Sequence, residues 1–261
     1  MNFFFGINNN VFQSQLTIPK FQNKKNEIIT TDVFKSFPKE NKWIVQKMYE
    51  KELNDQFYRI KGNNIKNNEI YFLANESNFN NKENLILKKF NNFTDTVPEY
   101  RSNLKIYFTD KGKGEGYSSY QSEYPYRMIK IKNSIVSQVY SLTNKKAKKN
   151  YILFRNIYEH PSHEEFFGYL IDVKTKKIIK KFTLLTNYTN FIEIENQLVN
   201  ADVYFVTDKF LGIPVFISEH FGHLSMEHTH PPHTYIISQS KFERVNILKK
   251  KINEIINKET F

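Results

Sequence analysis

The amino-acid sequence predicts an α+β fold, with a mixed or largely antiparallel sheet and a C-terminal amphipathic helix. Short apolar and aromatic runs with polar flanks, most of them in the second half, are typical of half-buried strands. The last segment has helical periodicity instead. No repeat or linker divides the 261 residues, so we expect a single compact domain over 1–261 with a soft internal division near residue 150.

The first half is predicted to contain one helix and two strands. Apolar residues at helical spacing, among them Trp43 and Met48, predict a helix over 39–56. The runs 69–74 and 104–109 are short and rich in aromatic and β-branched side chains, which favours buried strands.

The second half is predicted to be mostly strand. Segments 166–173 and 177–185 are separated by three polar residues and predict a β-hairpin. Two further buried strands are expected at 202–207 and 213–218. The segment 242–258 carries one apolar stripe among lysines and predicts an amphipathic helix docked on the domain.

Charge and composition limit the classes of function. Lysine and arginine number 38 against 27 acidic residues, a net charge of +11 that favours an anionic partner. We expect an anionic small molecule or a glycan as substrate, with nucleic acid as a further candidate partner. Without cysteine there is no disulfide and no Cys-ligated metal. No membrane span or targeting segment is apparent, so a cytoplasmic location is expected.

Five of the seven histidines fall within residues 219–233. Imidazole binds metal ions and carries protons near neutral pH. On a strand, alternate residues such as His228 and His230 point to one face and can chelate one ion. The pattern predicts a divalent zinc, iron or manganese site with nitrogen and oxygen ligands. We expect the metal ligands to be His228, His230 and His233, and His223 and Glu227 to act in acid–base catalysis.

Two short matches to known metal sites support this chemistry. His228-Thr229-His230-Pro231 with a serine seven residues later resembles the JAMM metalloprotease signature, and Glu165-x-x-Gly-x-Leu resembles its upstream motif. The resemblance implies that Glu165 is the catalytic base, although Lys241 stands where that family has an aspartate ligand. The spacing from Gly222 to His228 is also similar to part of a cupin motif, without the glutamate that should follow.

A glycine- and tyrosine-rich segment, 111–127, holds three of the eight glycines and predicts a substrate-binding loop. Its spacing is neither a P-loop nor a dinucleotide fingerprint. The expected substrate-binding residues are Lys113, Tyr117, Ser119, Tyr120, Gln121 and Arg127. A second His- and Glu-containing loop, 158–165, is expected to converge with 219–233 on one centre, the alternative being opposite sides of the fold.

The sequence-based hypothesis is therefore a metal-dependent enzyme, with hydrolysis favoured. A metal-free transferase with a histidine base and an anionic sugar- or nucleotide-type substrate is the first alternative. A non-catalytic module that binds nucleic acid or protein is the second.

Overall fold

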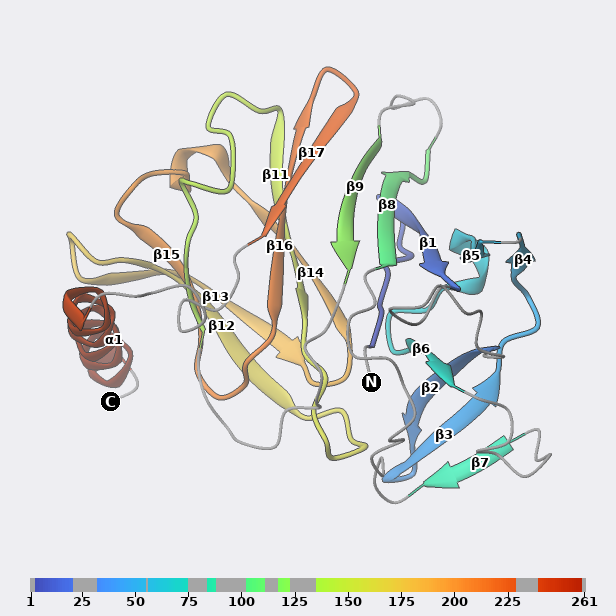
Figure 1. Cartoon of the computed structure of the whole chain (residues 1–261). Coiled ribbons are helices and arrows are strands. Elements are labelled where there is room, and N and C mark those ends of the chain that lie inside the picture. The colour runs from blue at the N-terminus through green and yellow to red at the C-terminus, as the bar shows by residue number, and fades with distance from the viewer. Residues whose placement is uncertain are drawn as a thin grey trace.

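The computed structural model describes residues 3–20, 32–54, 56–74, 84–87, 102–110, 117–122, 135–228 and 239–259. This part of the chain is mostly β, with four antiparallel sheets in a four-bladed, propeller-like arrangement and a single α-helix (Figure 1). The predicted α+β fold with a mixed sheet is therefore wrong. Unlike the blades of a regular propeller, each sheet is built from strands that are not all consecutive.

Two sheets come from the first half of the chain. In spatial order, sheet I consists of β6 (Ile70–Ala74), β2 (Asp32–Lys39), β3 (Lys42–Lys47) and β7 (Asn84–Leu87). Sheet II consists of β4 (Glu52–Leu53), β5 (Phe57–Ile60), β1 (Phe12–Pro19), β8 (Ser102–Phe108) and β9 (Tyr117–Ser122). A 3-10 turn, η1 (Gly62–Asn64), precedes β6.

The second half supplies the other two sheets and the helix. Sheet III consists of β14 (Thr189–Ile194), β11 (Lys149–Arg155), β16 (Ile213–His220) and β17 (His223–His228). Sheet IV consists of β10 (Val136–Gln138), β15 (Val203–Thr207), β12 (Glu165–Asp172) and β13 (Lys177–Leu185). A second 3-10 turn, η4 (Asn196–Leu198), and the helix α1 (Gln239–Glu259) complete the described elements.

Most individual elements lie where the sequence predicts them. The strands β6, β8, β15 and β16, the β12–β13 hairpin and α1 confirm the corresponding predictions. The helix predicted over 39–56 is wrong, because β2 and β3 form a hairpin there. Glu40 and Asn41 make its turn with positive φ angles of 51° and 57°, the geometry of a two-residue hairpin loop. Trp43 and Val45 are buried one residue apart, which is strand alternation.

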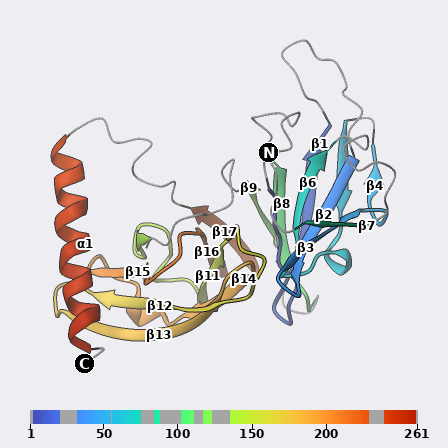
Figure 2. The same cartoon turned by 90° about the horizontal axis from the view of Figure 1, so that it is seen from below.

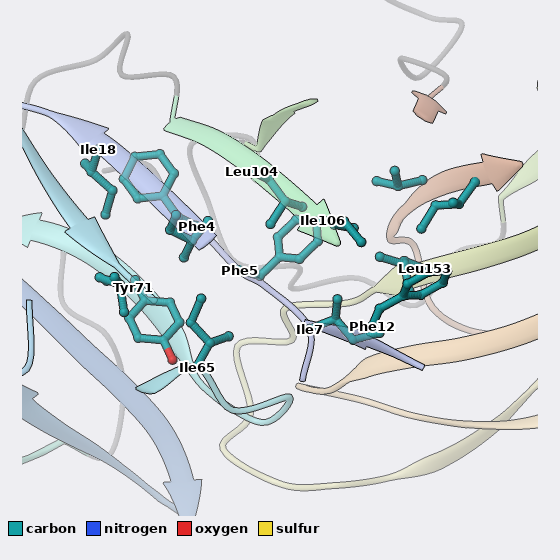
Figure 3. Close-up of a cluster of buried hydrophobic side chains, with 14 of the residues drawn as sticks. Phe4, Phe5, Ile7, Phe12, Ile18, Ile65, Tyr71, Leu104, Ile106 and Leu153 are labelled. Atoms are coloured by element: carbon teal, nitrogen blue, oxygen red, sulfur yellow. The ribbon is translucent and has the colours of Figure 1, made fainter. Parts of the chain in front are cut away.

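The largest core joins sheets I, II and III. Leu16, Ile106 and Leu153 meet there together with Phe12 and Tyr71, so residues from both halves of the chain share one apolar cluster (Figure 3). A second core lies between sheets III and IV, and α1 covers the outer face of sheet IV next to β12, β13 and β15 (Figure 2). The predicted single domain stays a prediction. Among the described residues no helix has the length and apolarity to cross a membrane.

Candidate functional site

The predicted histidine cluster lies mainly on β17. His223 begins this strand opposite His220, and His228 ends it opposite Val215. His223 and Glu227 are both exposed on the same face, but four residues of strand separate them by roughly 13 Å. For His228 the structure describes the backbone alone, and His230 and His233 lie outside the described residues.

The predicted catalytic base Glu165 is far from these groups in the topology. It is exposed at the start of β12, in sheet IV, and pairs with Leu185. The loop before it is held by structural hydrogen bonds: Asn187 Nδ2 donates to the carbonyl oxygens of His160 and Ser162, at 2.8 and 3.0 Å. His163 Nδ1 lies 2.9 Å from the carbonyl oxygen of Thr186. This part of the 158–165 loop therefore acts as a staple to the β13–β14 turn.

The two predicted histidine loops do not converge where the structure describes them. Residues 158–165 follow β11 beyond Arg155, whereas the turn at His220 and His223 lies next to Lys149, at the other end of β11. Seven residues of strand separate these ends, roughly 20 Å.

One predicted association is present at the level of the backbone. Strand β9, which contains the predicted substrate-binding residues Tyr117, Ser119, Tyr120 and Gln121, lies next to β17 at the junction of sheets II and III (Figure 1). The structure does not describe the side chains of β9, and Lys113 and Arg127 lie outside the described residues.

The predicted metal-dependent hydrolase is not supported. Within the described ranges, no group of three or more histidine, aspartate or glutamate side chains is arranged to hold a metal ion. The transferase alternative has no supporting observation either, since its anion-binding Arg127 is not described. The divalent metal itself stays an untested prediction for the histidines outside those ranges.

The described surface has a different candidate site, an open cavity of about 460 Å³ between the N-terminal segment and sheets III and IV. We call it the amide hollow, because asparagine and threonine dominate its polar lining. It is lined by Asn9, Asn10, Asn67, Phe182, Thr183, Leu184, Tyr188, Thr189, Asn190, Phe191 and Ile192.

Asn67 ties the walls of the hollow together. Its Oδ1 accepts the backbone N–H of Asn8 at 2.9 Å, and its Nδ2 donates to the carbonyl oxygen of Asn8 at 3.0 Å. Its own carbonyl oxygen accepts the N–H of Thr189 at 2.7 Å and a bond from Arg155 Nη1. Arg155 Nη1 also donates to Thr189 Oγ1 at 3.1 Å. The N-terminal segment, β11 and β14 are thereby fixed relative to one another.

Asn190 holds the opposite wall. Its Oδ1 accepts the N–H of Leu185 at 2.8 Å, and its Nδ2 reaches the carbonyl oxygens of Leu185, Tyr188 and Phe154 at 3.0 to 3.3 Å. Because the amides of Asn67 and Asn190 are used in this way, the hollow is rigid before any ligand arrives. The polar groups at its open side are those of the exposed Asn10 and Thr183 and the hydroxyl of Tyr188.

A buried charged cluster lies nearby, in sheet I. Glu69 is 2% exposed, accepts the hydroxyl of Tyr71 at 2.7 Å and lies 3.5 Å from Lys35 Nζ. Burial and then the negative charge of Glu69 raise the pKa of Tyr71 well above its usual value. A second pair, Tyr151 and Glu219 at 3.2 Å, also raises the pKa of the tyrosine, through burial first and carboxylate charge second. Both pairs are enclosed, and we assign them to stability.

Sequence reasoning missed the amide hollow. Its lining comes from three segments, at 9–10, 67 and 182–192, none of which carries a known motif. Asparagine is common throughout this chain, as in Asn8-Asn9-Asn10, so single asparagines carry no signal. No known protein family, curated protein or solved structure matches this chain significantly.

Proposed function

We propose that the protein binds a neutral saccharide in the amide hollow. The observation that carries the proposal is the lining itself: eleven residues, none of them charged, with asparagine and threonine beside three aromatic rings. A sugar presents hydroxyl groups at its edges and an apolar C–H face, which amides and aromatic rings complement respectively. The volume of about 460 Å³ lies within the range of small-ligand sites.

The hollow favours a neutral ligand over the anionic one that the net charge suggests. No lysine, arginine or histidine lines it, so the +11 charge of the chain is located elsewhere. The lining also contains no aspartate or glutamate. Glycoside hydrolysis ordinarily needs a pair of carboxylic acids, so the described lining supports binding and not cleavage.

Tyr188 is the residue on which the proposal can be tested. It is half-buried on the wall of the hollow, and its hydroxyl lies 3.5 Å from Asn67 Nδ2. Titration of a panel of neutral mono- and disaccharides, followed by calorimetry or saturation-transfer NMR, should identify a ligand. Tyr188→Ala should then weaken binding by roughly threefold to tenfold, the worth of one aromatic contact. Tyr188→Phe, which keeps the ring, should weaken it less.

A matched control separates the hollow from general surface effects. Tyr140→Ala removes an exposed tyrosine outside the hollow and should leave saccharide affinity unchanged. Thr183→Val, which removes only a rim hydroxyl, should lower affinity without lowering the melting temperature. Failure of every neutral saccharide to bind, or equal affinity of Tyr188→Ala and the wild type, would overturn the proposal.

A further inference from the structure

A strained, exposed aromatic residue lies at the tip of the β16–β17 hairpin (Figure 1). Phe221 and Gly222 form its two-residue turn, with φ angles of 49° and 75°. Glycine, asparagine and aspartate are favoured in such turns, because a side chain at positive φ meets its own backbone. Phe221 is nevertheless 86% exposed, so packing does not compensate for the strain. Backbone strain retained without a structural benefit points to function.

The ring of Phe221 is presented to solvent with a second ring against it. The His220 ring lies with its centroid 4.4 Å from that of Phe221, at an interplanar angle of 66°. His223, opposite His220 in the ladder, is also exposed. The hairpin therefore ends in an aromatic platform.

Lysines surround this platform, because the connection between β10 and β11 is fixed at the same end of sheet III. The N–H of Asn144 donates to Ser218 Oγ at 3.0 Å, and the N–H of Lys148 donates to the carbonyl oxygen of Glu219 at 2.7 Å. Lys145 and Lys146, between these two anchors, are both exposed. We call Phe221, His220, Lys145, Lys146 and Lys148 the tip surface.

The positive charge of the tip surface is only partly compensated. Glu219 is 5% exposed and lies 3.4 Å from Lys148 Nζ, while the neighbouring Lys149 pairs with Glu193 at 2.9 Å. Lys145 and Lys146 form no ion pair with any described residue. Glu227 lies on the exposed face of β17 but further along the strand.

We infer that the tip surface binds single-stranded nucleic acid, with Phe221 stacked on a base and Lys145, Lys146 and Lys148 neutralising adjacent phosphates. Aromatic stacking beside basic groups is how proteins bind single strands without reading their sequence. A duplex has its bases stacked already and offers no face to the ring. An anionic membrane is the weaker occupant, since even a myristoyl chain, larger than one phenyl ring, gives only marginal attachment.

The inference is independent of the amide hollow. The tip surface lies at the Lys149 end of β11, whereas Thr189 of the hollow pairs with Arg155 at the other end. Substitutions in the tip surface should therefore leave saccharide binding unchanged, and the two proposals can fail separately.

Fluorescence anisotropy of labelled oligo(dT) and oligo(U), with the full chain at about 50 mM salt, tests the inference. Phe221→Asn suits the turn, so its melting temperature should equal or exceed that of the wild type while affinity falls at least about fivefold. Lys145→Gln with Lys146→Gln should weaken binding and reduce the slope of log K against log salt by roughly two. Tyr49→Asn and Lys176→Gln, an exposed tyrosine and an exposed lysine elsewhere, are the matched controls.

Each alternative has its own outcome in the same experiment. Equal affinity for a duplex of the same length would overturn base stacking. Unchanged affinity of Phe221→Asn, or loss of affinity in the controls as large as in the tip variants, would reduce binding to general charge attraction and refute the site. Sedimentation with vesicles containing phosphatidylserine, but no oligonucleotide binding, would assign the surface to a membrane and overturn the inference.

Discussion

The hydroxyl of Tyr71 is predicted to be the main hydrogen-bond donor that makes the buried Glu69 carboxylate tolerable. Tyr71→Phe removes a bond of 2.7 Å to Glu69 Oε2 and leaves Lys35 Nζ, at 3.5 Å, as the remaining partner that we identify. A hydrogen bond to a charged group contributes about 1.5–3 kcal/mol, and removing one partner leaves the other group buried without it. The backbone N–H of Lys66 also loses an acceptor at 3.2 Å, but Lys66 is exposed and water can replace it.

We therefore expect Tyr71→Phe to lower the free energy of unfolding by about 2–3 kcal/mol. Urea denaturation followed by far-ultraviolet circular dichroism measures this change, provided that the dependence on urea keeps the same slope. Tyr169→Phe is the matched control. Tyr169 is 5% exposed, and its hydroxyl makes no hydrogen bond with a described residue, so its loss should change stability by about 0.5 kcal/mol or less.

A double-mutant cycle with Glu69→Gln isolates the pair. If the Tyr71–Glu69 bond carries the effect, the two substitutions together should cost clearly less than the sum of the single costs. An effect of Tyr71→Phe no larger than that of Tyr169→Phe would refute the reasoning.

The same pair predicts the dependence of stability on alkaline pH. The pKa of Tyr71 in the folded protein is raised well above the ordinary value of 10.0, so between these values the folded state holds a proton that the unfolded state has lost. Stability should therefore fall as the pH rises above about 10, and the fall should be shallower in Tyr71→Phe. An identical alkaline profile in the two proteins would contradict the assignment.

Three further changes test the fold. Gly212→Ala would place a Cβ 2.2 Å from Phe154 Cζ and 2.5 Å from the carbonyl oxygen of Arg155, so the free energy of unfolding should fall by about 2 kcal/mol or more in urea denaturation. Ile252→Asp puts a charge into the interface of α1 with sheet IV, and hydrogen exchange should show loss of protection confined to the helix and its sheet face. For Asp32, burial raises the pKa but hydrogen bonds from two lysines outweigh it and hold the pKa below 3.8. Its contribution is present above that value and lost as the pH falls through the folded pKa, so Asp32→Asn should flatten the acid limb of the stability profile.

Local sequence was sufficient for elements whose signal lies within their own residues. The alternation along 166–185 predicts the β12–β13 hairpin, and its turn is made locally, by Asp172 Oδ1 accepting the N–H groups of Lys174 and Thr175. The apolar stripe of 242–258 likewise predicts α1, whose Ile252 and Ile255 are buried. In both cases the periodicity that predicts the element is the one that buries it.

Local sequence failed where two periodicities overlap. The spacing of Trp43 and Met48 fits a helix, yet Trp43 and Val45 also alternate as in a strand. Pairing with β2 on one side and β7 on the other decided for the strand. These partners are supplied by distant parts of the chain, and β propensity depends on such neighbours.

For function, the sequence by itself determined the charge of the chain, the absence of cysteine and the crowding of histidines into 219–233. Only the tertiary structure decided what those residues face. A strand extends about 3.4 Å per residue, so the ladder of β17 separates His223 from His228 by roughly 17 Å instead of gathering them around one ion. Conversely, Asn67 and Tyr188, which are 121 positions apart, meet in one hollow because β11 and β14 pair and hold both ends of the chain against them.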